Sequence, residues 1–362
     1  MPDRELAQRR LVAQGLVTRP YPTPQDAVRA FGAIQGQDLP GALASAALRS
    51  TGRIEDVLAA LNDGSLVRGY PMRGTIFLAA ADDLRWMTEL MAGAPLRGAG
   101  PRRRELGLDD EQFDRAGAIL LDALEKTSRG LSRSEVLARL DDAGLSTAGG
   151  RGYHILYTLM SRSVLCYGPW NGAEQNIVAV NSWLPAGSGL EQRFNGDEVA
   201  ATAEVMRRYF TARGPATVRD FSWWSKIPLT QCRAALPLVD GVEQLPGDEP
   251  AYARPGLIDE VAELGRAVSK PLLLPGFDEF ILGYQDRLFA MTPEQHVQLV
   301  PGNNGVFRKS IVVGGLVKGF WLAKGRSGTR TLDAAPFRPL AKTTEAAVRR
   351  RFAEYPHLLA GR

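Results

Sequence analysis

The chain has 362 residues, enough for two or three domains, and its 44% hydrophobic and 23% charged content is normal for a soluble globular protein. Its net charge of +4, from 44 basic residues of which 37 are arginine, is compatible with a nucleic-acid partner, although a GC-rich genome produces the same arginine bias. No apolar run is long enough to span a membrane, the first residues lack a signal-peptide pattern and no Cys/His cluster has metal spacing, so we expect a cytoplasmic protein without membrane partner, metal or cofactor.

The first quarter of the chain predicts helices followed by a hairpin, which is the order of a winged helix. A cap at Thr23 with Pro24 in the first turn predicts a helix that runs to about Gln35, where Gly36 ends it. The other predicted helices of this part are 4–14, 40–48 and 54–61, and two extended runs lie within 66–78.

The same order of elements recurs twice. In the second round, Ser132 caps a helix with Glu135 at its third position; in the third, Asn195 and Thr217 are the expected caps. The second round comprises helices at 109–126, 133–140 and 150–162 and strands at 163–168 and 175–181. The third comprises helices at 196–212, from Thr217 and at 229–237, and strands near 242–246 and 250–254.

From Lys270 the pattern changes to strands at about 307–313, 316–324 and 328–333, with a closing helix at 343–355. Gly314-Gly315 between the first two strands predicts a tight hairpin. We therefore expect an α+β fold with three tandem winged helices, at 1–98, 105–190 and 195–269, and a C-terminal β-rich region with its hairpin and closing helix at 270–362.

Gln35-Gly36-Gln37 is the strongest candidate for a functional motif. Glutamine cannot titrate, but its amide can hold a water molecule or a polar substrate group at a fixed place. Positions i and i+2 do not face each other on a helix, whereas an extended pair after the break at Gly36 points to one side. A solvated surface or a helix cap is the alternative interpretation.

Several segments together resemble a known family. Phe277-Asp-Glu-Phe-Ile-Leu-Gly-Tyr284 with Asp286-Arg287 is similar to the C-terminal signature of the winged-helix family of bacterial DNA glycosylases that includes AlkZ and YcaQ. Gly214-Pro-Ala-Thr217, with Asp220, Phe221, Trp224 and Ser225, resembles its third winged helix, and Arg73-Gly74-Thr75 resembles its first wing. Gln35-Gly36-Gln37 falls where this family carries its catalytic Gln-x-Gln motif, that of the AlkZ branch.

This resemblance covers nearly the whole chain and implies a C-shaped monomer of three winged helices that excises alkylated bases from double-stranded DNA. It implies a monofunctional glycosylase acting on N7-alkylpurines, including bulky natural-product adducts and crosslinks, in base-excision repair or in antibiotic self-resistance. The chain departs from the family pattern at Gly36, usually a larger apolar residue, and at Phe77, where many relatives carry histidine. The second departure puts the substrate range in question.

Glutamine suits this chemistry because an N7-alkylated purine is already cationic. The base leaves neutral without a general acid, and the oxocarbenium-like transition state accepts a weakly activated water. We expect Gln37 to position that water and Gln35 to bind the sugar-phosphate or orient Gln37.

Candidate DNA-contacting residues are distributed over the chain. Those expected at DNA are Arg73, Thr75, Arg102, Arg103, Arg104, Lys309, Lys318 and Lys324. For the arginine run a solvated linker is an equal alternative, and for the 307–324 hairpin, whose apolar tip fits a groove or wedge, a core-packed sheet is the alternative.

Other chemistry-bearing residues are expected to be structural. Trp183, Trp223 and Trp224 are expected in the core, and so are the thiols of Cys166 and Cys232. Asp278, Glu279 and Asp286 either stabilise a sugar cation or, as we favour, form a buried salt bridge with Arg287.

Two other functions fit parts of the pattern. A non-catalytic winged-helix transcription regulator would bind DNA, but it would normally be smaller and carry a dimerisation or sensor region. A nucleosidase acting on free nucleosides would show an Asp-rich metal signature, which is absent from the sequence.

Overall fold

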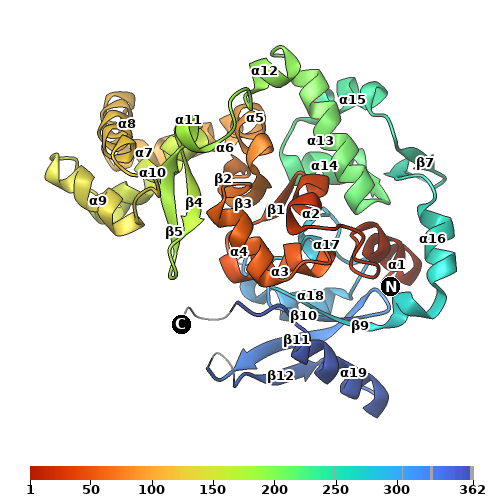
Figure 1. The fold of residues 1–362 in the computed structure, drawn as a ribbon. Coiled ribbons are helices and arrows are strands. Elements are labelled where there is room, and N and C mark those ends of the chain that lie inside the picture. The colour runs from red at the N-terminus through yellow and green to blue at the C-terminus, as the bar shows by residue number, and fades with distance from the viewer. Residues whose placement is uncertain (248, 304, 327–328, 359–362) are drawn as a thin grey trace. The chain divides into compact units, whose positions relative to one another are not determined.

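A computed structural model describes residues 1–247, 249–303, 305–326 and 329–358 and divides the chain into two compact units (Figure 1). Unit 1 combines Met1–Val57 with the chain from Ala203 onward, and unit 2 is Leu58–Thr202. Helices and antiparallel sheets are mixed in both, as the predicted α+β class requires. Unit 1 therefore joins the N-terminal segment to residues more than 140 positions later in the sequence.

Unit 1 is built from short helices, two antiparallel sheets and the short strand β1, which belongs to neither of these two sheets. Its helices are α1 (Arg4–Ala13), α2 (Pro24–Phe31), α3 (Leu39–Arg49), α14 (Val218–Ser225), α15 (Leu229–Ala235), α16 (Leu257–Leu264), α17 (Glu279–Leu282), α18 (Pro293–Leu299) and α19 (Lys342–Ala353). Its strands are β1 (Ala33–Gln35), β6 (Ala216–Thr217), β7 (Glu243–Leu245), β8 (Ala251–Ala253), β9 (Pro271–Leu274), β10 (Ser310–Val313), β11 (Leu316–Lys324) and β12 (Thr331–Pro336). Helices α4 (Ile54–Asn62) and α13 (Glu198–Arg213) contain the points where the chain passes between the units.

The C-terminal part of unit 1 is a four-stranded sheet in the order β12-β11-β10-β9, drawn in blue in Figure 1 with α19 beside it. Trp321 of β11 is completely buried between the sheet and Phe352 and Tyr355, and its indole N–H donates to the Leu274 carbonyl at 3.0 Å. Ala44 of α3 belongs to the same apolar cluster. The sheet therefore packs directly on the helix that follows Gln37.

Unit 2 has its own core. Its strands β2 (Leu66–Met72), β3 (Thr75–Ala80), β4 (Leu165–Trp170) and β5 (Gln175–Ala179) follow the order β3-β2-β4-β5, all antiparallel. The two predicted wings thus share one sheet. Its helices are α5 (Ala81–Met91), α6 (Gly93–Gly98), α7 (Gly100–Glu105), α8 (Asp110–Glu125), α9 (Arg133–Asp142), α10 (Arg151–Ser161), α11 (Val180–Trp183) and α12 (Leu190–Phe194), with α8, α9 and α10 contributing most of the apolar core.

The predicted helix caps at Thr23, Ser132 and Thr217 are confirmed. Each side chain accepts the amide of the third helical residue, and each helix has a complete capping box. The predicted hairpins are also present, although the strand predicted at 328–333 begins at a residue outside the described ones and its described part is β12. These elements follow from bonds between residues close in sequence.

The prediction for the end of α2 is wrong. The helix stops at Phe31 rather than near Gln35, because Gly32 adopts φ 72° and ψ −56°, a conformation open only to glycine. Gln35 consequently ends strand β1 instead of a helix. The extended conformation expected after Gly36 therefore begins already at Ala33.

The prediction that Asn195 caps the following helix is also wrong. Asn195 is the left-handed residue that ends α12, with φ 51°. Asp197 takes the capping role instead, since its Oδ1 accepts the amides of Val199 and Ala200 at 2.8 and 3.0 Å. Two turn-forming residues stand so close together that the sequence alone did not separate their roles.

The apolar tip of the β10–β11 hairpin is not an exposed wedge. Gly314 and Gly315 are buried, with φ 59° and 83°, as a two-residue turn with positive φ at both positions requires. A Cβ on Gly315 would lie 2.8 Å from the Cβ of Ala7 in α1. The wedge interpretation of this tip is therefore wrong, and the core-packed alternative holds.

Candidate active site

Gln35 and Gln37 differ sharply in their surroundings. Gln35 ends β1 and is 8% exposed, whereas Gln37, two residues later, is exposed at the start of the turn into α3. The side-chain Oε1 of Gln35 accepts the backbone N–H of Gln37 at 2.9 Å. The buried glutamine thus fixes the backbone from which the exposed Gln37 side chain extends.

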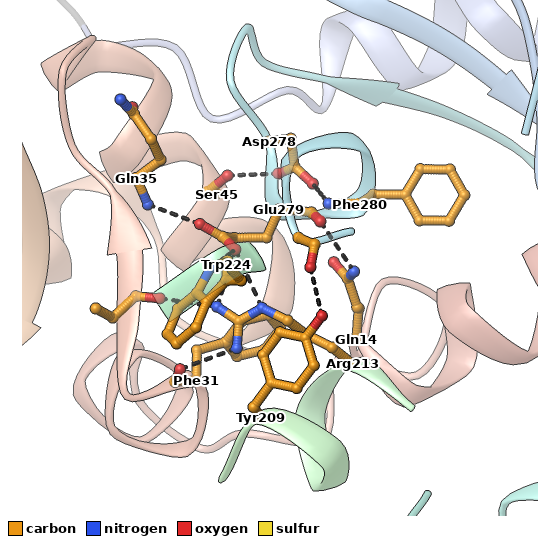
Figure 2. Close-up of polar contacts among 12 residues, drawn as sticks. Gln14, Phe31, Gln35, Ser45, Tyr209, Arg213, Trp224, Asp278, Glu279 and Phe280 are labelled. Atoms are coloured by element: carbon orange, nitrogen blue, oxygen red, sulfur yellow. Dashed lines mark hydrogen bonds and ion pairs between the residues drawn. The ribbon is translucent and has the colours of Figure 1, made fainter. Parts of the chain in front are cut away.

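A buried carboxylate holds Gln35 in place. The backbone N–H of Gln35 donates to Oε1 of Glu279 at 2.9 Å, across 244 positions of sequence (Figure 2). The other oxygen, Oε2, accepts the indole N–H of Trp224 at 3.1 Å. Glu279 is 1% exposed, so these bonds form away from competing water.

Arg213 neutralises Glu279 and binds the same strand. Its Nε and Nη2 donate to Oε2 of Glu279 at 3.1 and 2.9 Å. The guanidinium also donates to the carbonyls of Phe31 and Ala33 at 3.0 and 2.9 Å, and it lies 4.4 Å from the centroid of the Trp224 ring. The ion pair is therefore hydrogen-bonded to the backbone of Phe31, Ala33 and Gln35, which lie just before and within β1.

A second buried ion pair lies next to the first. Asp278 accepts both terminal nitrogens of Arg49 at 2.8 and 2.9 Å, and Ser45 of α3 also donates to it. Burial alone would raise the pKa of Asp278, but the Arg49 guanidinium and these hydrogen bonds hold it below its ordinary value. The carboxylate is therefore ionised, and it ties α3 to the start of α17.

Gln14 and Tyr284 close the network. Gln14 accepts from Arg49 at 2.6 Å and donates to the Glu279 carbonyl at 3.2 Å and to the Tyr284 hydroxyl at 3.0 Å. Tyr284 in turn donates to the Arg213 carbonyl at 2.8 Å, and burial raises its pKa to about 12. Gln14 and Tyr284 thus link the two ion pairs. The amide of Gln14 does not titrate, and the Tyr284 hydroxyl stays protonated at physiological pH.

The predicted salt bridge is present but with other partners. Asp278 and Glu279 pair with Arg49 and Arg213, not with Arg287, whose guanidinium lies between the rings of Trp223 and Phe307 at 5.0 and 4.9 Å from their centroids. Asp286 is exposed. The sequence carries no local signal for these pairs, because each joins segments that are 66 or more positions apart.

Of the expected core residues, most are buried. Trp224 is 1% exposed, and the thiols of Cys166 and Cys232 are free and buried, as predicted. Trp183 and Trp223 are only half-buried. Phe77, which replaces the histidine of many relatives, is 1% exposed and belongs to the interior of unit 2.

The candidate DNA-contacting lysines of unit 1 lie in three environments. Lys309 is half-buried with its Nζ 5.0 Å from the centroid of the Trp321 ring, and burial lowers its pKa, an effect that the carboxylate of Asp38 opposes. Lys318 lines a cavity of about 450 Å³ together with Arg338. Lys324 is exposed and lies 2.8 Å from Asp333.

The remaining candidates belong to unit 2. Arg73, with φ 60°, and Gly74 form the turn between β2 and β3, and Thr75 begins β3. On α7, Arg102 is exposed and paired with Glu105 at 2.8 Å, and Arg104 is exposed. Arg103 instead donates inward, to the Leu96 carbonyl at 2.6 Å and to Thr158 at 3.4 Å.

Two further structural facts bear on the chemistry. Within the described ranges, no group of three or more His, Cys, Asp and Glu side chains is placed to hold a metal ion. No helix among the described residues combines the length and apolarity needed to cross a membrane.

Comparison with known proteins agrees with the resemblance carried by the motifs. The chain is 27% identical over 330 residues to an "Interstrand DNA cross-link repair glycosylase" of Streptomyces sahachiroi, covering 88% of this chain and 87% of that protein. The solved structure of Streptomyces sahachiroi DNA glycosylase AlkZ has the same fold, with a TM-score of 0.75, 23% identity and coverage of 98% and 96% of the two chains. The family model for "DNA glycosylase AlkZ-like" matches residues 28–357, which include both glutamines and both buried ion pairs. This chain therefore belongs to the AlkZ-like DNA glycosylase family.

Proposed function

We propose that the protein is a monofunctional DNA glycosylase that hydrolyses the N-glycosidic bond of cationic N7-alkylpurines in double-stranded DNA. The observation that carries this proposal is the pair formed by an exposed Gln37 and a buried Gln35, joined by a 2.9 Å hydrogen bond. Membership of a family of DNA glycosylases favours the enzyme over the non-catalytic transcription regulator. The three tandem winged helices expected from the sequence are part of the same proposal.

The reaction needs little from the protein. In an N7-alkylated purine the N9–C1′ bond breaks with its electron pair moving to N9, which neutralises the cationic base. The oxygen of a water molecule bonds to C1′ of the oxocarbenium-like sugar and releases a proton to solvent. The amide oxygen of Gln37 accepts a hydrogen bond from that water and aims it at C1′.

Gln35 supports this step without touching the water. Its Oε1 already accepts the Gln37 backbone N–H, so its part is to orient Gln37. A neutral, unmodified base would leave as an anion, and neither glutamine can protonate it. The protein should therefore release cationic alkylated bases and leave neutral, unmodified bases attached to the sugar.

DNA binding is proposed for the cationic and polar residues expected from the sequence. In unit 1 these are Lys309, Lys318 and Lys324; in unit 2 they are Arg73, Thr75 and the exposed Arg102 and Arg104. The internal hydrogen bonds of Arg103 point to a structural contribution at that position. Such contacts position the backbone of DNA and make binding sensitive to salt.

The curated relative is named for interstrand cross-link repair. We extend this substrate class to the present chain, so bulky N7 adducts and crosslinks are proposed beside simple alkylpurines. The biological setting is then base-excision repair of alkylation damage or self-resistance to a genotoxin.

The test is single-turnover release of 7-methylguanine from a duplex, scored as abasic sites. Gln37→Ala should lower the rate by about 100-fold or more because the attacking water is no longer held. Gln244→Ala is the matched control, since Gln244 is an exposed glutamine on β7 of the same unit. It should leave the rate unchanged.

Four results would contradict the proposal. An unchanged rate in Gln37→Ala would remove Gln37 from the reaction. A substantial rate on undamaged DNA would overturn the charge argument. A shifted electrophoretic band without abasic sites would indicate the regulator, and base release from free nucleosides only would indicate a nucleosidase.

A further inference from the structure

We propose that Glu279 is a positioning residue for the reaction: together with Arg213 it acts as a substitute strand that fixes β1 and, through Gln35, the direction of Gln37. This inference rests on the proposed function. It differs from a purely structural salt bridge because the bonds from the pair end on the backbone of β1, at Ala33 and at Gln35 of the candidate catalytic motif.

The geometry is that of a ladder along one edge of β1. In an extended strand the backbone groups of residues i and i+2 point to the same edge, and an edge without a partner strand leaves them unpaired. Here Arg213 donates to the Ala33 carbonyl at 2.9 Å, and Glu279 accepts from the Gln35 amide at 2.9 Å. One donor and one acceptor thus meet the two groups that a neighbouring strand would otherwise bind.

The two carboxylate oxygens of Glu279 have separate partners. Oε1 accepts the amide of Gln35, while Oε2 accepts from Arg213 and from the indole of Trp224 (Figure 2). Arg213 and Trp224 therefore fix the plane of the carboxylate, and Oε1 is left aimed at the strand. The Arg213 and Glu279 side chains are 0% and 1% exposed, so neither has space to swing into solvent.

The path from Glu279 to the exposed amide consists of two hydrogen bonds. The first runs from the Gln35 backbone to Glu279, and the second from the Gln37 backbone to the Gln35 side chain. A displacement of β1 is transmitted to Gln37, and a shift of about 1 Å in a positioning group can cost about 100-fold in rate. The buried carboxylate itself has no exposed surface with which to contact DNA.

The neighbouring ion pair provides a matched control. Arg49 and Asp278 are also 0% and 1% exposed, and Asp278 directly precedes Glu279. Beyond the pair itself, their hydrogen bonds go to Ser45, Gln14 and Phe280 rather than to β1. Replacing either pair by two methionines removes opposite charges together, which avoids a buried unpaired charge. The two double variants differ in whether the edge of β1 loses its partners.

The first measurement is hydrogen exchange at the Gln35 amide, which does not depend on activity. Arg213→Met/Glu279→Met should accelerate this exchange at least about tenfold over wild type, while Arg49→Met/Asp278→Met should leave it protected. Equal protection in both variants would overturn the inference even if the enzyme is active. If wild type releases no alkylated base, the proposed function fails, and this measurement still decides whether the ion pair holds β1.

The second measurement is a double-mutant cycle with Gln37. The milder Glu279→Gln, which keeps the size of the side chain, also guards against failure of the methionine variant to fold. It should lower the single-turnover rate at least about tenfold with the DNA dissociation constant unchanged, but change the rate less than about threefold when Gln37 is already alanine. Equal losses in both backgrounds, or a loss in DNA affinity alone, would show that Glu279 does not act through Gln37.

Discussion

At the scale of single residues, burial decides what a chemically weak side chain can do. Gln35 and Gln37 are the same residue type two positions apart. The 8% exposure of Gln35 and its bond to the Gln37 backbone make it a support, while the exposure of Gln37 leaves its amide available to water. The sequence identified the pair, but its division of labour depends on the neighbours that bury one member.

Burial also predicts the reactivity of the two thiols. It raises the pKa of Cys166 to about 12 and that of Cys232 to about 11, so both thiols stay protonated and inert at pH 8. A disulfide-exchange reagent at pH 8 should label neither thiol in the native protein and both in denaturant. Rapid labelling of one thiol without denaturant would contradict its buried position.

At the scale of elements, sequence patterns predicted the helix ends correctly where the capping bonds join residues close in sequence. The capping boxes at Thr23, Ser132 and Thr217 each satisfy backbone amides within three residues, so the sequence was sufficient to predict them. Thr292 caps α18 in the same way, with Gln295 as its partner, so the same local pattern in the sequence marks the start of this helix. The end of α2 was misjudged because Gly32 and Gly36 are both plausible stops.

The packing of the β10–β11 hairpin on α1 can be tested with glycine substitutions. Gly315→Ala suffers both a positive φ of 83° and a Cβ 2.8 Å from Ala7, whereas Gly256→Ala, at φ 73°, meets no described heavy atom within 4 Å. We expect Gly256→Ala to cost about 1–2 kcal/mol and Gly315→Ala about 1–3 kcal/mol more, because the added methyl overpacks the contact.

Urea unfolding of the two variants measures this difference. Both glycines belong to unit 1, so the two variants change the same compact part of the chain. Equal losses of unfolding free energy in the two variants would contradict the close contact between Gly315 and Ala7 of α1.

At the scale of the whole molecule, the N-terminal and C-terminal parts of the chain share one unit. Gln14, Gln35 and Arg49 come from the first 57 residues, and Arg213 and Glu279 from the chain after residue 202. The network of both ion pairs connects these segments. The candidate site therefore forms only when the two ends of the sequence fold together.

The second ion pair predicts a component of acid sensitivity. The folded-state pKa of Asp278 lies below its ordinary value of 3.8, so its contribution is fully present above that value and is lost as pH falls through the lower folded-state pKa. Asp278→Asn should cost about 3–5 kcal/mol near neutral pH because Arg49 loses its partner. The difference in unfolding free energy from wild type should stay constant above about pH 5 and shrink below about pH 4.

Unfolding measured between pH 3 and pH 7 for wild type and Asp278→Asn tests this prediction. A difference that is independent of pH down to pH 3 would mean that folding does not shift the pKa of Asp278, and it would contradict the lowered folded-state pKa. A difference that grows on acidification would reverse the sign of the linkage and contradict the ion pair.

The sequence by itself determined the α+β class, the helix caps, the hairpins and the glutamine pair, because each depends on residues within a few positions of one another. It also carried the family resemblance in motifs that the family match confirms. Only the tertiary structure decided that Glu279 and Arg213 hold β1, that Asp278 pairs with Arg49 and that the hairpin tip is buried. The physical reason is that ion pairs and packing contacts across tens to hundreds of positions leave no periodicity in the sequence, since chain separation does not limit which side chains meet in a folded core.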